Sequence, residues 1–308
     1  MSLALLFPGQ GTQHVQMLPW LEDEPEARPL LERVAGALGN DWRQRLADPD
    51  WLTANAIAQP LLVGVESAAW ACLAARLPPP AVVAGYSVGE LAAFAAAGVF
   101  DADIAFELSR LRARLMAAST ADEPTGMVAV RELPLQVIQT WCGRHGLFIA
   151  IRLGVDRAIV AGPAAALQAA RGDPAIVGGR LDDIGVRVAS HTPLMRPAQR
   201  AFAAHLTTID LRAPTARLVC NLTGTSIRRE QELAHCLSAQ IANPVLWDTC
   251  METIAEARVG CVLEVGPGTT LATLWRTSQP DIPARSIDDF RSADAVAGWV
   301  AKIMASAR

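Results

Sequence analysis

The stretch AVVAGYSVGE, residues 81–90, joins a short apolar run to a helix-forming run. Its centre, GYSVG at 85–89, has the G-x-S-x-G pattern of a nucleophile elbow, in which glycines permit a strained turn between a strand and a helix. Such a turn exposes the hydroxyl of Ser87 and directs the first helical amides, starting with Val88, towards the position of an acyl oxyanion. The pattern predicts that Ser87 is a covalent nucleophile; the alternative is a tight turn with an ordinary exposed serine.

Short apolar runs alternate with longer helical patterns along most of the chain, which is typical of an α/β protein with a parallel sheet. Buried strands are expected at 3–7, 81–84, 218–222 and 261–265. Helices are expected at 25–38, 60–76, 88–97, 102–118, 195–206, 230–241 and 245–257.

The middle of the chain has shorter segments. Strands are expected there at 127–130, 147–151, 158–161 and 184–188, with helices near 134–143 and 163–171. This β-α-β-β-α-β order is that of a ferredoxin-like unit. Turn formers at 122–126 and 190–193 mark its two ends. The sequence therefore predicts a small domain at 125–189, inserted into a core formed by 1–124 and 190–308.

Length and composition indicate a compact enzyme of roughly two domains. The chain has 308 residues, of which 51% are hydrophobic and 19% charged. Its 27 basic and 31 acidic residues give no overall positive field, so nucleic acid is not an expected partner.

The six cysteines show no C-x-x-C pair, so neither a zinc site nor a disulfide framework is expected, and the thiols are interpreted as reduced and cytosolic. The N-terminus enters an apolar strand without the features of a signal peptide. Because no apolar stretch of about 18 residues is free of charges and turn formers, a membrane span is not expected either. The predicted location is cytoplasmic, with no metal and no bound cofactor.

Two further segments contain polar residues in informative places. Gln10 lies between two glycines after the first strand, in a loop whose backbone can approach a ligand closely. Arg112 shares its helix face with apolar residues, whereas Arg110 and Arg114 fall on the opposite face. A guanidinium on an apolar face needs an anionic partner, which is either a structural acid or a carboxylate of the substrate.

A serine nucleophile also needs a base, because its hydroxyl is hardly ionised at neutral pH. His191 has the most constrained local sequence of the five histidines, since Pro193 follows it, and His14 is the reserve candidate. Gln240, near the end of a helix, is a candidate for orienting the base through its side-chain amide or main-chain carbonyl. The alternatives are a structural histidine and an exposed glutamine.

Taken in order, these segments resemble the malonyl-CoA:acyl-carrier-protein transacylase family over most of the chain. The matching segments are FPGQGTQ at 7–13, GYSVGE at 85–90, RARLM at 112–116, SHTPLM at 190–195, QIANPV at 240–245 and EVGPG at 264–268.

The resemblance implies an α/β-hydrolase-like core with a ferredoxin-like insert, and a role for each site residue. Ser87 would be the acylated nucleophile and His191 its general base. Arg112 would bind the free carboxylate of the malonyl group. Gln10 and Val88 would supply the oxyanion donors, and Gln240 would position the histidine. The implied partners are malonyl-CoA and an acyl-carrier protein.

Two departures distinguish the chain from the fatty-acid enzymes. Tyr86 stands where those enzymes usually have histidine, and the loop LGVDR at 153–157 lacks their asparagine. With the short region at 20–23, these features are similar to the epsilon subunit of malonate decarboxylase. That branch implies a carrier subunit with a CoA-derived prosthetic group and further decarboxylase subunits as partners. A transacylase of fatty-acid or polyketide synthesis, a serine thioesterase or esterase, and a non-catalytic subunit of a complex remain as alternatives.

Overall fold

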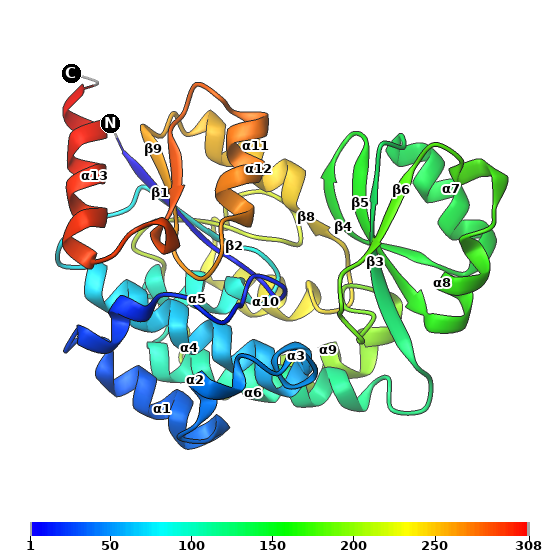
Figure 1. Ribbon diagram of the computed structural model, residues 1–308, viewed down its shortest axis with the longest axis horizontal. Helices are drawn as coiled ribbons and strands as arrows, with labels where there is room; N and C mark the ends of the chain where they lie inside the picture. The colour runs from blue at the N-terminus through cyan, green and yellow to red at the C-terminus, as the bar shows by residue number, and fades with distance from the viewer. Residues whose placement is uncertain (1, 307–308) are drawn as a thin grey trace.

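The computed structural model describes residues 2–306, which fold into two sheets lying side by side, with helices packed around them (Figure 1). Among these residues, the first sheet has five parallel strands in the order β10-β9-β1-β2-β7. They are β1 (Leu3–Phe7), β2 (Val82–Gly85), β7 (Arg217–Val219), β9 (Cys261–Glu264) and β10 (Ala284–Ser286). Strands β1 and β9 are buried at every position, as parallel strands covered on both faces require.

Helices cover both faces of this sheet. One face shares a hydrophobic core with α1 (Arg28–Leu38), α4 (Asn55–Leu73), α5 (Gly89–Ala96), α6 (Ala102–Ala118), α9 (Arg196–Leu206), α10 (Leu233–Ala239) and α13 (Ala293–Ser306). The other face packs against α11 (Trp247–Glu256) and α12 (Thr270–Ser278). Short helices occur at α2 (Trp42–Arg45) and α3 (Pro49–Thr53), and 3-10 turns at Pro19–Asp23, Pro174–Ile176, Pro193–Met195, Glu230–Glu232 and Ile287–Asp289.

Helix α4 is long and apolar enough to span a membrane by length and composition, but 78% of its most apolar window is buried inside the protein. It contacts α1, α5 and α6. A helix that is apolar on all sides and surrounded by other helices is typical of a protein core.

The second sheet is built mainly from the middle of the chain. Its order within residues 2–306 is β6-β3-β5-β4-β8. The strands are β3 (Thr125–Arg131), β4 (Phe148–Gly154), β5 (Arg157–Pro163), β6 (Arg180–Asp183) and β8 (Val245–Leu246), and the helices are α7 (Leu135–His145) and α8 (Ala164–Ala170). The first four strands pair antiparallel, as in a ferredoxin-like unit, which confirms the expected α/β fold class.

Strand β8 comes from the segment before α11, outside residues 125–189, and adds parallel to β4 (Figure 1). The second sheet is therefore connected to the rest of the protein by strand β8 as well as by the two ends of the 125–189 segment. The division of the chain at 124/125 and 189/190 into two domains stays a prediction.

The strand expected at 184–188 is wrong. The fourth strand of this unit is β6, which ends at Asp183. Gly185 follows with a φ of +70°, which takes the chain out of the sheet. Ile184 and Val186 instead face the cavity between the two sheets. Residues 184–188 therefore form a partly buried link and not a paired strand.

Candidate functional site

Ser87 lies at the junction of β2 and α5, in the turn that the sequence predicts. Its φ is 56°, in the left-handed region that residues other than glycine rarely adopt. The flanking glycines are needed because the backbones touch. A Cβ on Gly85 would lie 2.2 Å from the backbone of Gly89, and one on Gly89 would lie 2.2 Å from the carbonyl oxygen of Pro8. These close contacts hold the turn after β2 against the loop after β1, and so they fix the position of Ser87.

His191 lies in direct contact with this serine. The Oγ of Ser87 and the Nε2 of His191 are 2.7 Å apart, and Nδ1 lies 2.6 Å from the main-chain oxygen of Gln240. A carbonyl oxygen only accepts, so Nδ1 carries the proton. Nε2 is then the free acceptor for the serine proton, which is the tautomer that a general base requires.

The surroundings keep this imidazole neutral. Burial, followed by the positive charge of Arg112, lowers the pKa of His191 to about 3. The reserve candidate His14 is elsewhere: its Nε2 lies 2.6 Å from a carboxylate oxygen of Asp288, and it does not line the cavity of Ser87.

Arg112, on the buried face of α6, lies beside the same serine. One guanidinium nitrogen is 3.5 Å from Ser87 Oγ and from the side-chain oxygen of Gln240, and the other donates to Gln59 at 2.7 Å. Its Nε has no hydrogen-bond partner, and no acid among residues 2–306 forms an ion pair with it. Burial lowers the pKa of Arg112 to about 10, so the group remains a cation at neutral pH. Within residues 2–306 it is a buried charge with no ion-paired acid, although the nearby buried carboxyl of Glu90 acts to raise its pKa.

Gln59 is a polar residue of this site that the sequence interpretation missed. It lies on α4, is 1% exposed, and orients the Arg112 fork while its own amide donates to Asn55. In the sequence it stands immediately before the helix expected at 60–76, whereas α4 begins at Asn55 and includes it.

The two expected oxyanion donors are main-chain amides. Gln10 lines the cavity next to Ser87, and its side-chain amide is bonded to the main-chain oxygen of Thr53. Val88 is 1% exposed and is not among the residues that line this cavity, although its amide directly follows Ser87. Within the described residues, neither amide donates to a protein acceptor. Both remain available to a developing negative charge.

Ser87, His191, Arg112 and Gln10 all line one cavity of about 380 Å³. The carboxyl ends of the parallel strands supply its polar floor. The second sheet, the link after β6 and α12 supply apolar walls, which are Met127, Ile151, Leu153, Ile159, Ile184, Val186, Leu271 and Leu274. A cavity of this size and lining suits a small acyl group held at the serine.

The 264–268 segment shapes this wall. Both carboxylate oxygens of Glu264 accept amides from the first turn of α12, from Leu271 at 3.1 Å and from Ala272 at 2.8 Å. The acid therefore caps the helix whose leucines line the cavity. Its role is to place that helix, and it does not face the serine.

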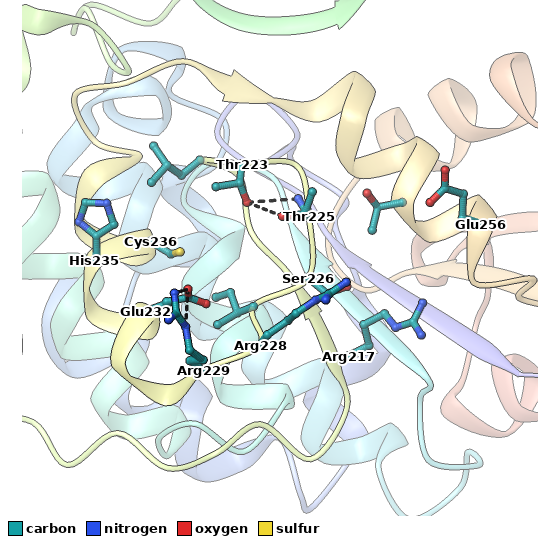
Figure 2. Close-up of a pocket in the computed structure, with 13 residues that line it drawn as sticks. Arg217, Thr223, Thr225, Ser226, Arg228, Arg229, Glu232, His235, Cys236 and Glu256 are labelled. Atoms are coloured by element: carbon teal, nitrogen blue, oxygen red, sulfur yellow. Dashed lines mark hydrogen bonds and ion pairs between the residues drawn. The ribbon is translucent and has the colours of Figure 1, made fainter.

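A second, larger hollow of about 1100 Å³ lies between the loop after β7 and helices α10 and α11, and shares no lining residue with the serine cavity. Figure 2 shows Arg229 paired with Glu232 on its wall. The hollow holds three arginines and two glutamates, so its charges nearly balance and it has no strong preference for an anion.

Known proteins match the chain over almost its whole length. Residues 4–297 match the family described as "Acyl transferase domain". The chain belongs to this acyltransferase family. The acyltransferase is 35% identical over 301 residues to the malonyl CoA-acyl carrier protein transacylase of Mycobacterium bovis, covering 96% of this chain and 99% of the relative.

Solved structures agree with this placement. The crystal structure of MCAT from Mycobacterium tuberculosis matches the acyltransferase with a TM-score of 0.86 and 34% identity, covering 96% of this chain and 99% of the other. The structure described as a type II PKS acyl-carrier protein in complex with its malonyl-transacylase contains a chain that matches with a TM-score of 0.88 and 27% identity, covering 95% of this chain and 98% of that one. None of these three names supports the expected placement in the malonate decarboxylase branch.

Proposed function

We propose that this acyltransferase moves a malonyl group from malonyl-CoA, through an ester on Ser87, to the thiol of an acyl carrier protein. The observation that carries the proposal is a buried cation without an acidic partner, Arg112, within 3.5 Å of a serine that is bonded to a neutral imidazole. A malonyl thioester offers one carboxylate for the guanidinium and one carbonyl carbon for the serine. The names of the full-length relatives support the same substrate.

In the first half-reaction, Ser87 attacks the thioester carbonyl as its proton passes to Nε2 of His191. The carbonyl of Gln240 accepts from Nδ1 and steadies the imidazolium that forms. The amides of Gln10 and Val88 stabilise the oxyanion. The intermediate collapses when the C–S bond breaks, and the proton on His191 goes to the departing CoA sulfur.

In the second half-reaction, the carrier thiol gives its proton to the same imidazole and attacks the serine ester. The C–O bond to Ser87 breaks, and the proton returns from His191 to the serine oxygen. The reaction therefore follows a ping-pong scheme. The apolar walls of the cavity favour transfer over hydrolysis, because they limit the water that reaches the ester.

Arg112 provides the selectivity for a dicarboxylic acyl group. An acetyl group would leave the guanidinium buried without an anion, and leaving a buried charge unpaired costs about 2–5 kcal/mol. A malonyl carboxylate removes that cost and also offsets the positive charge that lowers the pKa of His191. Substrate binding thus makes the imidazole a stronger base at the moment when it is needed.

For the carrier, we assign the acyltransferase to fatty-acid or polyketide synthesis. The relatives named above support this assignment, including the malonyl-transacylase found in complex with a type II PKS acyl-carrier protein. The carrier subunit of malonate decarboxylase is a second candidate, which Tyr86 favours. In this structure the Tyr86 ring packs edge-on against Trp247, with 5.2 Å between ring centroids, and lines the cavity.

The test is incubation of the purified protein with malonyl-CoA and, separately, with no acceptor, with a fatty-acid-type carrier and with a decarboxylase-type carrier. A malonyl thioester on the first carrier, formed much faster than on the second, supports the assignment. The reverse preference would move the protein to the decarboxylase branch. Release of free malonate at the same rate with and without any carrier would identify a thioesterase instead.

A further inference from the structure

Asn221 contacts the nucleophile elbow but plays no part in the mechanism described above. It follows the end of β7 and is 0% exposed. Its side-chain oxygen accepts the amide proton of Ser87 at 2.8 Å, and its side-chain nitrogen donates to the main-chain oxygen of Gly85. One amide side chain therefore bonds to both sides of the turn.

The elbow needs such a partner for a physical reason. The left-handed conformation of Ser87 costs about 1–3 kcal/mol and persists only if the surroundings enforce it. The amide of Ser87 and the carbonyl of Gly85 lie at the end of β2, where pairing with β7 has already stopped at Ala84 and Val219. Both are polar groups that need a partner once they are buried. A side chain with one donor and one acceptor satisfies both, and an asparagine has this combination.

Asn221 is itself anchored by Glu90 on the first turn of α5. The main-chain amide of Asn221 donates to Oε1 of Glu90 at 2.7 Å, and Glu90 is 0% exposed. Its second oxygen, Oε2, has no hydrogen-bond partner. Burial raises the pKa of this carboxyl well above its usual value, and the positive charge of Arg112 opposes that rise. The hydrogen bond from Asn221 needs only an acceptor oxygen, which a carboxyl group and an amide both offer.

We propose that Asn221 is a positioning residue that holds Ser87 in its reactive conformation, and that Glu90 anchors Asn221 through a hydrogen bond and not through charge. The inference rests on the proposed role of Ser87 as the nucleophile. Hydrogen bonds then run from Glu90 on α5 to Asn221 in the loop after β7, and from Asn221 to the elbow at Ser87.

The first experiment compares Asn221→Ala with the wild type and with Thr223→Ala. Thr223 is exposed in the same loop, on the wall of the hollow in Figure 2, and makes no contact with the elbow. Asn221→Ala should lower kcat for malonyl transfer about 100-fold, since a small displacement of a reacting group has an effect of this size. KM for malonyl-CoA should change less than about threefold, because Arg112 still binds the carboxylate. Thr223→Ala should behave as the wild type.

The second experiment separates the hydrogen bond of Glu90 from its charge. Glu90→Gln retains a side-chain oxygen that accepts from Asn221, so its kcat should stay within about threefold of the wild type. Glu90→Ala removes the acceptor and should lower kcat about tenfold or more. Activity close to the wild type in both variants would overturn the anchoring role. A loss in Glu90→Gln as large as that in Glu90→Ala would show that charge matters, which also contradicts the proposal.

The rate at which a fluorophosphonate labels Ser87 provides a readout that does not depend on malonyl transfer. Asn221→Ala should reduce the labelling rate by the same factor as kcat. A folded Asn221→Ala protein that is labelled at the wild-type rate would overturn the proposal. If the wild type is labelled at Ser87 but transfers no malonyl group, the proposed function fails while the positioning role is still measured. If Asn221→Ala does not fold, the two Glu90 variants decide by the same labelling assay.

Discussion

Ser87 and His191 both occupy the left-handed backbone region, with φ of 56° and 63°, and the two strained residues meet in one hydrogen bond of 2.7 Å. Each backbone is fixed by a bond to its amide. Ser87 donates to the side chain of Asn221, and His191 donates to the main-chain oxygen of Ile241 at 2.9 Å. The surrounding structure therefore stabilises both strained backbones, and the Oγ of Ser87 and the Nε2 of His191 are already in hydrogen-bond contact.

The first prediction concerns the nucleophile. Ser87→Ala should abolish the malonyl adduct that forms when the protein is mixed with malonyl-CoA, because the attacking oxygen is gone. Intact-mass spectrometry measures the adduct. The matched control is Ser190→Ala, which removes a second hydroxyl from the same cavity and should leave the adduct in place. A malonyl adduct on the Ser87→Ala protein would mean that a different residue is acylated.

The second prediction concerns selectivity. Arg112→Ala should lower kcat/KM for malonyl-CoA by about 30-fold or more, which corresponds to a loss of about 2 kcal/mol. Transfer from acetyl-CoA should persist or rise, since the unpaired charge is removed. Arg114→Ala, an exposed arginine on the same helix, should change neither rate. Equal losses with both substrates would argue against the carboxylate-binding role.

The third prediction concerns the acid side of the pH profile. An ordinary histidine gains a proton below about pH 6.5 and stops acting as a base. The pKa of His191 is lowered to about 3, by burial first and by Arg112 next. The value of kcat/KM for malonyl-CoA, which reports the free enzyme, should therefore stay nearly constant from about pH 7 to about pH 5.

The Arg112→Ala protein tests the cause of that shift. Removing the neighbouring positive charge should raise the pKa of His191, so the acid limb for acetyl transfer should move to higher pH than in the wild type. A wild-type rate that falls with an apparent pKa near 6.5 would show that the imidazole is not protected from protonation.

The sequence predicts some parts of this site better than others. The elbow at Ser87 is visible locally, because G-x-S-x-G between an apolar run and a helix has one structural meaning. The partnership of Ser87 with His191 spans 104 residues, and no local pattern contains it; the family resemblance brought the two together. Gln59 was missed because the helix expected at 60–76 begins after it, whereas α4 begins at Asn55. The donor-and-acceptor role of Asn221 could not, because it depends on where β7 ends relative to β2.

The fold shows the same contrast. Apolar runs such as residues 3–7 gave the strand β1 with its bounds, since buried parallel strands have a strong local pattern. The three residues of β10 are too few and too polar to stand out. The apolar residues at 184–188 fit a strand, but the pairing of a strand depends on its neighbour as well as on its own sequence. Gly185 removes this segment from the sheet that β6 completes.

The last prediction concerns stability and the buried acids behind the active-site loop. Glu66 on α4 is 0% exposed, and neither of its carboxylate oxygens has a hydrogen-bond partner among residues 2–306. Burial and the neighbouring Glu264 raise the pKa of Glu66 well above its usual value, and burial raises that of Glu264 to about 8. In the folded protein these groups hold their protons at a pH where the unfolded chain has lost them. The contribution of these carboxyl groups to the free energy of unfolding is therefore fully present below their pKa in the unfolded chain, near 4.5. It is lost as the pH rises through the folded-state pKa, which is about 8 for Glu264.

Glu66→Gln cannot ionise, so it should lose less stability than the wild type between about pH 6 and about pH 9. Urea unfolding at the two pH values measures the difference. The control is Glu256→Gln, on the exposed surface of α11, which should lose stability in parallel with the wild type. If the wild type and Glu66→Gln lost the same amount, Glu66 would have to be charged throughout this range. A buried cation or an ordered donor would then have to compensate it, because an uncompensated carboxylate at this depth is too costly for the fold to retain.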